Sequence, residues 1–149
     1  MKNIHVYIGT WTGDEQDGIY HFSLNTGSGD LTPAGKTQPV PEPFFLIVNA
    51  AGDRLYATNA ADEIDGVEGG TISAFAIDPA SGDLTFLNRQ PSRGKLPCYL
   101  SLDHTGRHLL TGNYTSGSVA VLPIKADGSL GPSTDFHQHA GRSVNLERQ

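Results

Sequence analysis

The sequence contains a single cysteine, Cys98, so the chain cannot form an internal disulfide. A lone thiol fits a reducing compartment. Long apolar runs are also absent, and none approaches the roughly 18 residues of a membrane-spanning helix. The opening residues, MKNIHVYIG, alternate apolar and polar side chains and lack the apolar core of a signal peptide. Together these features predict a cytoplasmic protein that does not enter a membrane.

Positive charge is scarce. The chain has 10 Lys and Arg against 16 Asp and Glu, a formal net charge of -6. Nucleic-acid-binding domains carry a basic patch, and the sequence shows none, so no nucleic acid is expected as a partner. The few cations cluster at Arg89, Arg93 and Lys95. Such a group either attracts a phosphate or forms a solvated charged loop, and the solvated loop is the favoured interpretation.

Helical periodicity is rare, whereas 18 Gly and 9 Pro divide the chain into short segments. Hydrophobic residues make up 37% and charged residues 17%, which is too apolar and too weakly charged for a disordered chain. The short apolar runs are rich in β-branched and aromatic residues, and Gly, Pro, Asp and Ser separate them. The sequence therefore predicts an all-β fold.

Two blocks of the sequence repeat. Residues 97–113, PCYLSLDHTGRHLLTGN, align without a gap on residues 43–59, PFFLIVNAAGDRLYATN, at an offset of 54. Residues 75–85 align on residues 22–32 at an offset of 53, and a weaker third copy spans residues 117–130. Repeats of this length indicate a modular architecture built from similar units.

Each repeat contains four short apolar runs. In the best-defined copy they are Tyr56 to Thr58, Thr71 to Ile77, Leu84 to Leu87 and Tyr99 to Leu102. Four strands in a repeat of about 50 residues are typical of propeller blades. A β-sandwich with coincidental internal similarity is the alternative.

Antiparallel hairpins sort the connections between these runs by face. The turns at residues 79–82 and 103–106 fall at one end, the lower face. Connections at the opposite end, the upper face, are longer and more varied, as expected of a working surface on a rigid scaffold. The upper connections are residues 38–43, 60–69, 89–96, 113–117 and 136–149.

Two motifs taken together are the most specific in the chain: Pro97-Cys-Tyr99 and Asn113-Tyr-Thr-Ser-Gly-Ser-Val119. Weaker ones are Tyr7-Ile-Gly-Thr10, Gly18-Ile-Tyr20, residues 52–59, residues 82–85 and Ser143 to Gln149. These motifs resemble the N-terminal part of the seven-bladed β-propeller lactonase family, and the resemblance covers residues 1–149. Seven blades of about 50 residues need about 340 residues, so the chain is expected to form one partial propeller of about two and a half blades.

The resemblance implies the hydrolysis of a sugar lactone, as in the 6-phosphogluconolactonase step of the pentose phosphate pathway, with no cofactor. In the family, the residues that match Glu147-Arg148-Gln149 are followed by a candidate catalytic histidine, which here is expected beyond Gln149. The catalytic residues are therefore unknown, and whether this chain is itself an enzyme stays open. Two alternatives remain: a lactonizing cycloisomerase of the carboxy-muconate type, and a non-catalytic propeller fragment or binding module.

Five residues are candidates for contact with the lactone. Asn113 and Tyr114 lie on the expected upper face, where they can donate hydrogen bonds, although for Asn113 a structural role in capping the turn that follows is the favoured interpretation. Arg93 and Arg148 can attract a phosphate. Glu147 either orients the expected histidine or is solvated.

His137 and His139 lie two residues apart, so on a strand their side chains share a face and can chelate a metal. No third ligand has a convincing spacing, and structural zinc needs four. The acidic residues from Asp62 to Glu68 lack the ligand order of a calcium loop. No metal is predicted.

A partial propeller has open edges. Propellers protect their sheets by radial closure, but the expected strand from His5 to Thr10 has no closing partner in the sequence. Exposed apolar surface and an unpaired edge favour association between chains. Self-association through the open edges is therefore expected.

Overall fold

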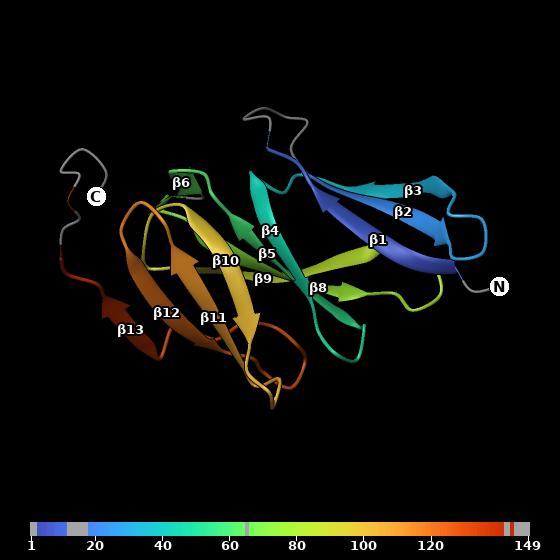
Figure 1. The fold of residues 1–149 in the computed structure, drawn as a ribbon. Helices are drawn as coiled ribbons and strands as arrows, with labels where there is room; N and C mark the ends of the chain where they lie inside the picture. The colour runs from blue at the N-terminus through green and yellow to red at the C-terminus, as the bar shows by residue number, and fades with distance from the viewer. Residues whose placement is uncertain (1–2, 12–17, 65, 142–143, 145–149) are drawn as a thin grey trace.

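The computed structural model describes residues 3–11, 18–64, 66–141 and 144, and the fold within them is all β, as predicted (Figure 1). This described part contains no helix, and so none with the length and apolarity needed to cross a membrane. A small ribbon pairs β6 (Glu63–Ile64) with β7 (Val67–Glu68). The remaining strands form three antiparallel sheets.

The three sheets follow one another along the chain. The first sheet contains β1 (Asn3–Gly9), β2 (Ile19–Asn25) and β3 (Leu31–Thr37). The second contains β4 (Pro43–Val48), β5 (Arg54–Asn59), β8 (Thr71–Ile77) and β9 (Leu84–Pro91). The third contains β10 (Pro97–Leu102), β11 (His108–Asn113), β12 (Ser118–Pro123) and β13 (Asp135–Gln138).

Figure 1 shows the sheets side by side, with the first and third sheets flanking the second. The second and third sheets are four-stranded meanders, the arrangement of a propeller blade. In the first sheet, β1 takes the position that β5 and β11 take in the others. Within the described residues, the first sheet therefore lacks the strand equivalent to β4 and β10, and β1 pairs only with β2.

The sequence repeat and the structural sheet do not coincide. The sequence grouped the run at 99–102 with three runs of the second sheet, but the structure places it, as β10, in the third sheet. The chain crosses from one sheet to the next after β9, because β9 stays paired with β8 as far as Pro91. For the same reason, Arg89 lies within β9 and not in the upper loop where it was expected.

Local side-chain chemistry builds the lower turns. Oδ1 of Asn49 accepts the backbone N–H groups of Asp53 and Arg54. Oδ1 of Asp103, 54 residues later, accepts the two N–H groups at the equivalent positions. Short Asn and Asp side chains favour turns because they satisfy backbone donors that no strand partner reaches. The repeat in sequence is thus a repeat of turn geometry.

Two apolar clusters fill the spaces between the sheets. Between the first and second sheets lie Ile19, Val40, Leu55, Ala57, Phe75 and Ile77. Between the second and third lie Tyr56, Ile72, Ala74, Leu100, Leu109, Ala120, Leu122 and Leu130. Side chains alternate along a strand, so Leu55 and Ala57 of β5 face one cluster and Tyr56 faces the other. The second sheet is therefore covered on both faces.

Two tyrosines tie neighbouring sheets together at their lower ends. The hydroxyl of Tyr7, on β1, donates to the carbonyl oxygen of Gly82, in the turn after β8, at 2.7 Å. The hydroxyl of Tyr56, on β5, donates to the carbonyl oxygen of Gly128, in the turn after β12, at 3.1 Å. Each of these sheets is thus hydrogen-bonded to the lower turn of the sheet that follows it.

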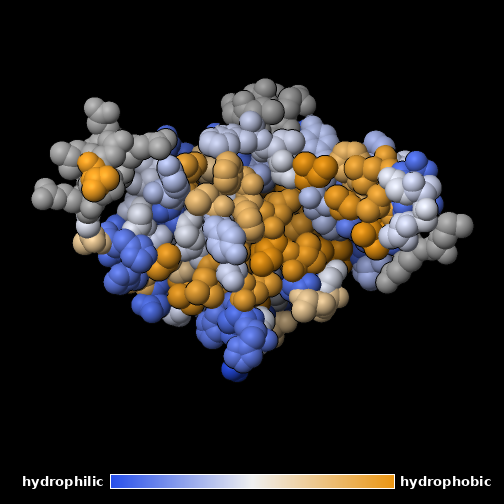
Figure 2. Space-filling model, viewed as in Figure 1, coloured by the Kyte–Doolittle hydropathy of each residue, from blue (hydrophilic) through white to orange (hydrophobic). Residues whose placement is uncertain are grey.

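Apolar side chains remain exposed on the face of the molecule drawn in Figure 2. They gather over the middle of this view, where Figure 1 draws β4. Phe44 and Val48 of β4 and Tyr99 of β10 are exposed. In a propeller the innermost strands surround the central channel, and this surface corresponds to that side.

Candidate functional site

Four loops lie at the upper ends of the sheets, and their described residues are 38–42, 60–64 with 66–70, 92–96 and 114–117. Among the described residues, the non-glycine positions with positive φ all fall in these loops: Glu42 (φ 38), Arg93 (φ 60) and Leu96 (φ 53). Such backbone persists only where its surroundings hold it, and it is common at functional sites. Loop 92–96, which contains two of the three, is named the strained loop and is the centre of the candidate site.

Two of the strained residues repeat. Glu42 and Leu96 directly precede the prolines that open β4 and β10. The carbonyl oxygen of Glu42 accepts the N–H of Ala60 at 3.0 Å, and that of Leu96 accepts the N–H of Tyr114 at 2.9 Å. These bonds fix the point at which each inner strand begins, and the second bond joins the strained loop to Tyr114.

The strained loop is held on both sides. Towards the second sheet, the Ser92 hydroxyl donates to the carbonyl oxygen of Gly70 at 2.9 Å, and within the loop its oxygen lies 3.0 Å from the carbonyl oxygen of Gly94. Towards the third sheet, the N–H of Lys95 donates to Oγ of Ser116 at 3.0 Å. A loop fixed in this way can present a side chain without losing further conformational entropy on binding.

Asn113, a predicted substrate contact, is buried beneath the strained loop. Its Nδ2 donates to the carbonyl oxygen of Ser92 at 3.0 Å and to Oγ of Ser118 at 3.1 Å. Both amide hydrogens are therefore used inside the protein. Oδ1 is buried without a hydrogen-bond partner in the described part of the chain. Asn113 thus bridges the strained loop and β12, and its Oδ1, an acceptor, is the one polar atom of this side chain left unpaired among the described residues.

Arg93 and Tyr114 reach the surface of the upper face. The guanidinium carbon of Arg93 lies 4.5 Å from the ring centroid of Phe136, a cation–π contact. Within the described residues, this guanidinium makes no hydrogen bond. The side chain of Tyr114 is 75% exposed. A guanidinium stacked on a ring keeps its N–H edge available for a phosphate or carboxylate.

The remaining predicted cations and contacts do not all join this group. Nε of Arg89 donates to Oγ of Ser73 at 3.2 Å, on the second sheet. The predictions for Glu147 and Arg148 fall outside the described residues. The structure therefore brings Arg93, Asn113 and Tyr114 together around the strained loop and places Arg89 apart from them.

Sequence reasoning missed three contributors to this site. Ser116 and Ser118 lie in the Ser-Gly-Ser segment of the motif 113–119, and that segment was the available signal. Phe136 had no local signal, because it meets Arg93 only when β13 packs beside the strained loop.

A cavity of about 430 Å³ opens on the lower face, at the opposite end from the strained loop. Its lining comes from the lower turns of the second and third sheets and the strand ends beside them: residues 49–51, 53, 54, 56, 102–106, 124–126 and 128. Polar groups line part of it, so their existing partners decide whether it can serve as a site.

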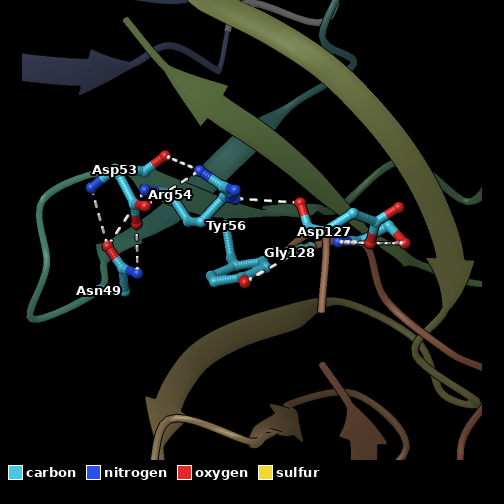
Figure 3. A network of polar contacts seen from close by, with 7 residues as sticks. Asn49, Asp53, Arg54, Tyr56, Asp127 and Gly128 are labelled. Atoms are coloured by element: carbon cyan, nitrogen blue, oxygen red, sulfur yellow. Dashed lines mark hydrogen bonds and ion pairs between the residues drawn. The ribbon is translucent and has the colours of Figure 1, made fainter. Parts of the chain in front are cut away.

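Figure 3 shows the hydrogen bonds at the wall of this cavity. Arg54 donates to the carbonyl oxygens of Asp53 at 2.7 Å and Asp127 at 3.1 Å, and it forms an ion pair with the Asp53 carboxylate at 3.2 Å. Tyr56 donates to Gly128, and burial raises the pKa of Tyr56 to about 12. These groups join the turns of two sheets, so we assign the cavity wall a structural role.

Within the part of the chain that the structure describes, no three His, Cys, Asp or Glu side chains are grouped to hold a metal ion. The rings of His137 and His139 lie 5.0 Å apart, edge to face.

The group on the upper face consists of the guanidinium of Arg93, the phenol of Tyr114 and the buried amide of Asn113. Such a group is suited to binding a small anionic or hydroxylated molecule.

Residues 5–149 match the family described as lactonase, seven-bladed β-propeller. The 6-phosphogluconolactonase of Bacillus subtilis (strain 168) is 37% identical over 143 residues, which cover 96% of this chain and 39% of the relative. A solved structure from Bacteroides fragilis NCTC 9343, provisionally assigned as a 6-phosphogluconolactonase, superposes with a TM-score of 0.87 at 34% identity. That match covers 99% of this chain and 39% of the other.

The periplasmic gluconolactonase of Pseudomonas aeruginosa superposes with a TM-score of 0.82 at 29% identity, over 93% of this chain and 39% of the other. The chain thus spans about 39% of the length of these relatives. Its three sheets accordingly form a partial propeller, as the repeat predicted. Family match, sequence identity and superposition agree, and the chain belongs to the seven-bladed β-propeller lactonase family.

Proposed function

We propose that this protein takes part in the hydrolysis of a sugar lactone of the 6-phosphogluconolactone type, in carbohydrate metabolism. Relatives from Bacillus subtilis and Formosa agariphila are named 6-phosphogluconolactonases, which supports the proposal. The structural observation that carries it is the strained loop, which holds Arg93 on the ring of Phe136 beside the exposed Tyr114.

In this reaction, water adds to the lactone carbonyl carbon and the ring C–O bond breaks, giving the open-chain hydroxy acid. The chemistry needs a base for the water proton, donors for the developing oxyanion and a cation for the phosphate. We assign Arg93 to the phosphate and the Tyr114 hydroxyl to a hydrogen bond with the sugar. Asn113 acts as a positioning residue, because it supports the strained loop from below.

The base is not assigned to any described residue. The family resemblance expects a histidine beyond Gln149 for this role, with Glu147 and Arg148 close to it. The reaction as written requires no redox step and no cofactor, since only water is consumed.

The decisive experiment is to assay the native gene product and its Arg93→Ala variant with 6-phosphogluconolactone. Loss of a charge-assisted contact of about 1.5–3 kcal/mol raises KM roughly 10- to 150-fold, with a smaller effect on kcat. Lys125→Ala, which removes a cation at the lower cavity, is the matched control and leaves KM unchanged. An Arg93→Ala enzyme with the KM of the wild type would remove Arg93 from the site.

The product of the reaction separates the proposal from its alternatives. A hydrolase converts the lactone into the hydroxy acid, which NMR identifies directly. A lactonizing cycloisomerase instead forms a lactone from a carboxy-muconate, and a binding module turns over neither compound. The intact mass of the native gene product, measured on the same sample, states which polypeptide carries the activity.

We further propose that residues 1–149 act as one partial-propeller domain whose small-molecule partner is the lactone. The net charge of -6 supports the absence of a nucleic-acid partner. A cytoplasmic location is supported by the single cysteine. Because the Pseudomonas aeruginosa relative is described as periplasmic, cell fractionation with an antibody to this protein is the test.

A further inference from the structure

Two serines continue the hydrogen-bond network beneath the strained loop. Oγ of Ser116 accepts the N–H of Lys95 at 3.0 Å and lies 3.1 Å from Oγ of Ser118. Oγ of Ser118 in turn accepts an amide hydrogen of Asn113. A serine hydroxyl has one proton to donate and two positions at which it accepts. The direction of the bond between the two serines therefore decides which hydroxyl proton is used inside the protein and which is left.

Burial sets the direction of this bond. Ser118 is 2% exposed, and its hydroxyl has two hydrogen-bond partners among the described residues, Asn113 and Ser116. Asn113 donates in its contact and cannot be turned over, because its Oδ1 would then face the carbonyl oxygen of Ser92. A proton of Ser118 that did not go to Ser116 would be buried without an acceptor, which is costly. Ser118 therefore donates to Ser116.

The hydroxyl of Ser116 is left with a free proton. Both acceptor positions of its Oγ are used, one by the N–H of Lys95 and one by the hydroxyl of Ser118. Its own O–H finds no acceptor in the described part of the chain. Ser116 is half-buried, whereas Ser118 is closed off from solvent. The free proton is thus the one that a ligand on the upper face can reach.

The equivalent hydroxyl of the second sheet directs its proton the other way. Thr71 takes the place of Ser118 there, because it lies opposite Asn59. Oδ1 of Asn59 accepts the hydroxyl protons of Thr71 at 3.4 Å and of Ser73 at 2.6 Å. In the third sheet, Nδ2 of Asn113 faces the serine instead. The second sheet closes its hydrogen bonds inside the protein, and the third directs them outward to the strained loop.

The free O–H lies beside the cations of the strained loop. Oγ of Ser116 is bonded to the backbone of Lys95, and it lies so close to Gly94 that an added Cβ there would overlap it. The side chains of Arg93 and Lys95 are exposed, and neither forms an ion pair with a described residue. A hydroxyl donor next to a guanidinium provides the kind of hydrogen bonds that phosphate oxygens accept.

We propose that Ser116 binds the phosphate of the substrate by donating its hydroxyl proton to a phosphate oxygen beside Arg93. This inference rests on the proposed function, which assigns Arg93 to the phosphate, and it adds a neutral donor to that cation. A phosphate monoester has several terminal oxygens, so both donors can be satisfied at once. Asn113 and Ser118 are positioning residues, because their hydrogen bonds leave the proton of Ser116 free to point at the ligand.

Binding of 6-phosphogluconate, the product of the proposed reaction, tests this inference without requiring turnover. Phosphorus NMR titration of the native gene product measures the dissociation constant even in the millimolar range. Ser116→Ala raises this constant about 10- to 150-fold, the effect of losing one hydrogen bond to a charged group. Ser116→Thr keeps the hydroxyl and most of the affinity. Ser133→Ala, which removes a half-buried hydroxyl at the lower end of β13, is the matched control and binds like the wild type.

A double-mutant cycle with Arg93→Ala separates a direct contact from an indirect one. If Ser116 only held the strained loop, and through it Arg93, then Ser116→Ala would have no further effect once Arg93 was removed. A direct contact with the phosphate instead keeps a loss of about tenfold or more in the Arg93→Ala background. Far-ultraviolet circular dichroism checks that each variant keeps its fold.

Four results would overturn the inference. These are a wild-type protein that does not bind 6-phosphogluconate, a Ser116→Ala variant that binds it like the wild type, a Ser116→Thr variant as weak as Ser116→Ala, and a loss that disappears in the Arg93→Ala background. Failure of the proposed function looks different. A protein that binds 6-phosphogluconate through Ser116 but does not hydrolyse the lactone keeps the phosphate site and loses the assignment as a hydrolase.

Discussion

Nδ1 of His5 lies 2.9 Å from Nε2 of His21, and the pair sits directly against Gly82 at the boundary between the first and second sheets. His21 is buried, and its Nδ1 has no hydrogen-bond partner among the described residues. The ring of Tyr7 stacks on His21 at 5.1 Å, beside the bond from Tyr7 to Gly82. The histidine pair and the hydrogen bond from Tyr7 to Gly82 therefore join the first and second sheets at the same place.

This pair makes the stability of the protein depend on pH. Burial, and then His5, lower the pKa of His21 below its ordinary value of 6.5, while the negative charge of Asp83 opposes the shift. The unfolded chain therefore takes up the His21 proton at a higher pH than the folded one. Stability is fully present above pH 6.5 and falls as the pH drops below it. Thermal unfolding between pH 8 and pH 5 measures this, and His21→Asn flattens the profile.

Two controls separate the histidine pair from general acid sensitivity. His104→Gln removes an exposed histidine of a lower turn and keeps the wild-type profile. Hydrogen bonds lower the pKa of Asp78 and of Asp103, so the stability that these carboxylates contribute is lost as the pH falls through the ordinary carboxyl range and below it, under the interval from pH 8 to pH 5. Trp11, the single tryptophan, contacts Phe44 across the same sheet boundary and reports its opening by fluorescence. A His21→Asn profile as steep as the wild type would contradict the assignment.

The hydrogen bond from Tyr56 to Gly128 predicts that removing the hydroxyl of Tyr56 lowers stability even though the packed ring stays in place. Tyr56→Phe keeps the ring and removes the donor, which leaves the Gly128 carbonyl oxygen without its partner. We expect a loss of about 1–3 kcal/mol in the free energy of unfolding, measured by chemical denaturation. Tyr20→Phe is the control, because no described residue accepts a hydrogen bond from the Tyr20 hydroxyl. We expect Tyr20→Phe to keep the wild-type free energy of unfolding, and an equal loss in both variants would contradict the role of the Tyr56 hydrogen bond.

The strained loop predicts a specific requirement for glycine at position 94. A Cβ there would overlap Oγ of Ser116 and lie 2.5 Å from Nδ2 of Asn113. Gly94→Ala therefore displaces the loop and lowers stability by about 1–3 kcal/mol, the usual cost of overpacking. If Arg93 binds the substrate, KM rises as well.

Gly112→Ala is the matched control for that substitution. The nearest atom to its added Cβ is Cβ of Tyr99 at 3.9 Å, an ordinary contact. We expect wild-type stability and KM for Gly112→Ala. Equal stability for the two alanine variants, measured by thermal unfolding, would show that the loop accommodates the methyl group.

The sequence predicted those features that depend on neighbours along the chain. The offset of 54 residues placed Pro43 with Pro97 and Asn59 with Asn113, and the structure pairs Pro43 with Asn59 and Pro97 with Asn113 in their sheets. Turn chemistry is equally local, because the side chain of Asp103 bonds the backbone only four and five residues ahead. Periodicity and turn residues therefore determined the class of fold and the end of the sheets at which we propose the site.

Only the tertiary structure decided which groups meet between sheets. In sequence, Asn113 could be a surface donor or a structural cap, and the structure uses both its amide hydrogens inside the protein, one of them on Ser92 from the preceding connection. Tyr7 reaches Gly82 across 75 residues, and Arg93 meets Phe136 only through the packing of β13. Such contacts depend on how one sheet stacks on the next, and that stacking is set by side-chain volumes summed over two faces. The local sequence pattern does not determine how the side-chain volumes of two facing sheets add up, so these contacts between sheets could be identified only in the folded structure.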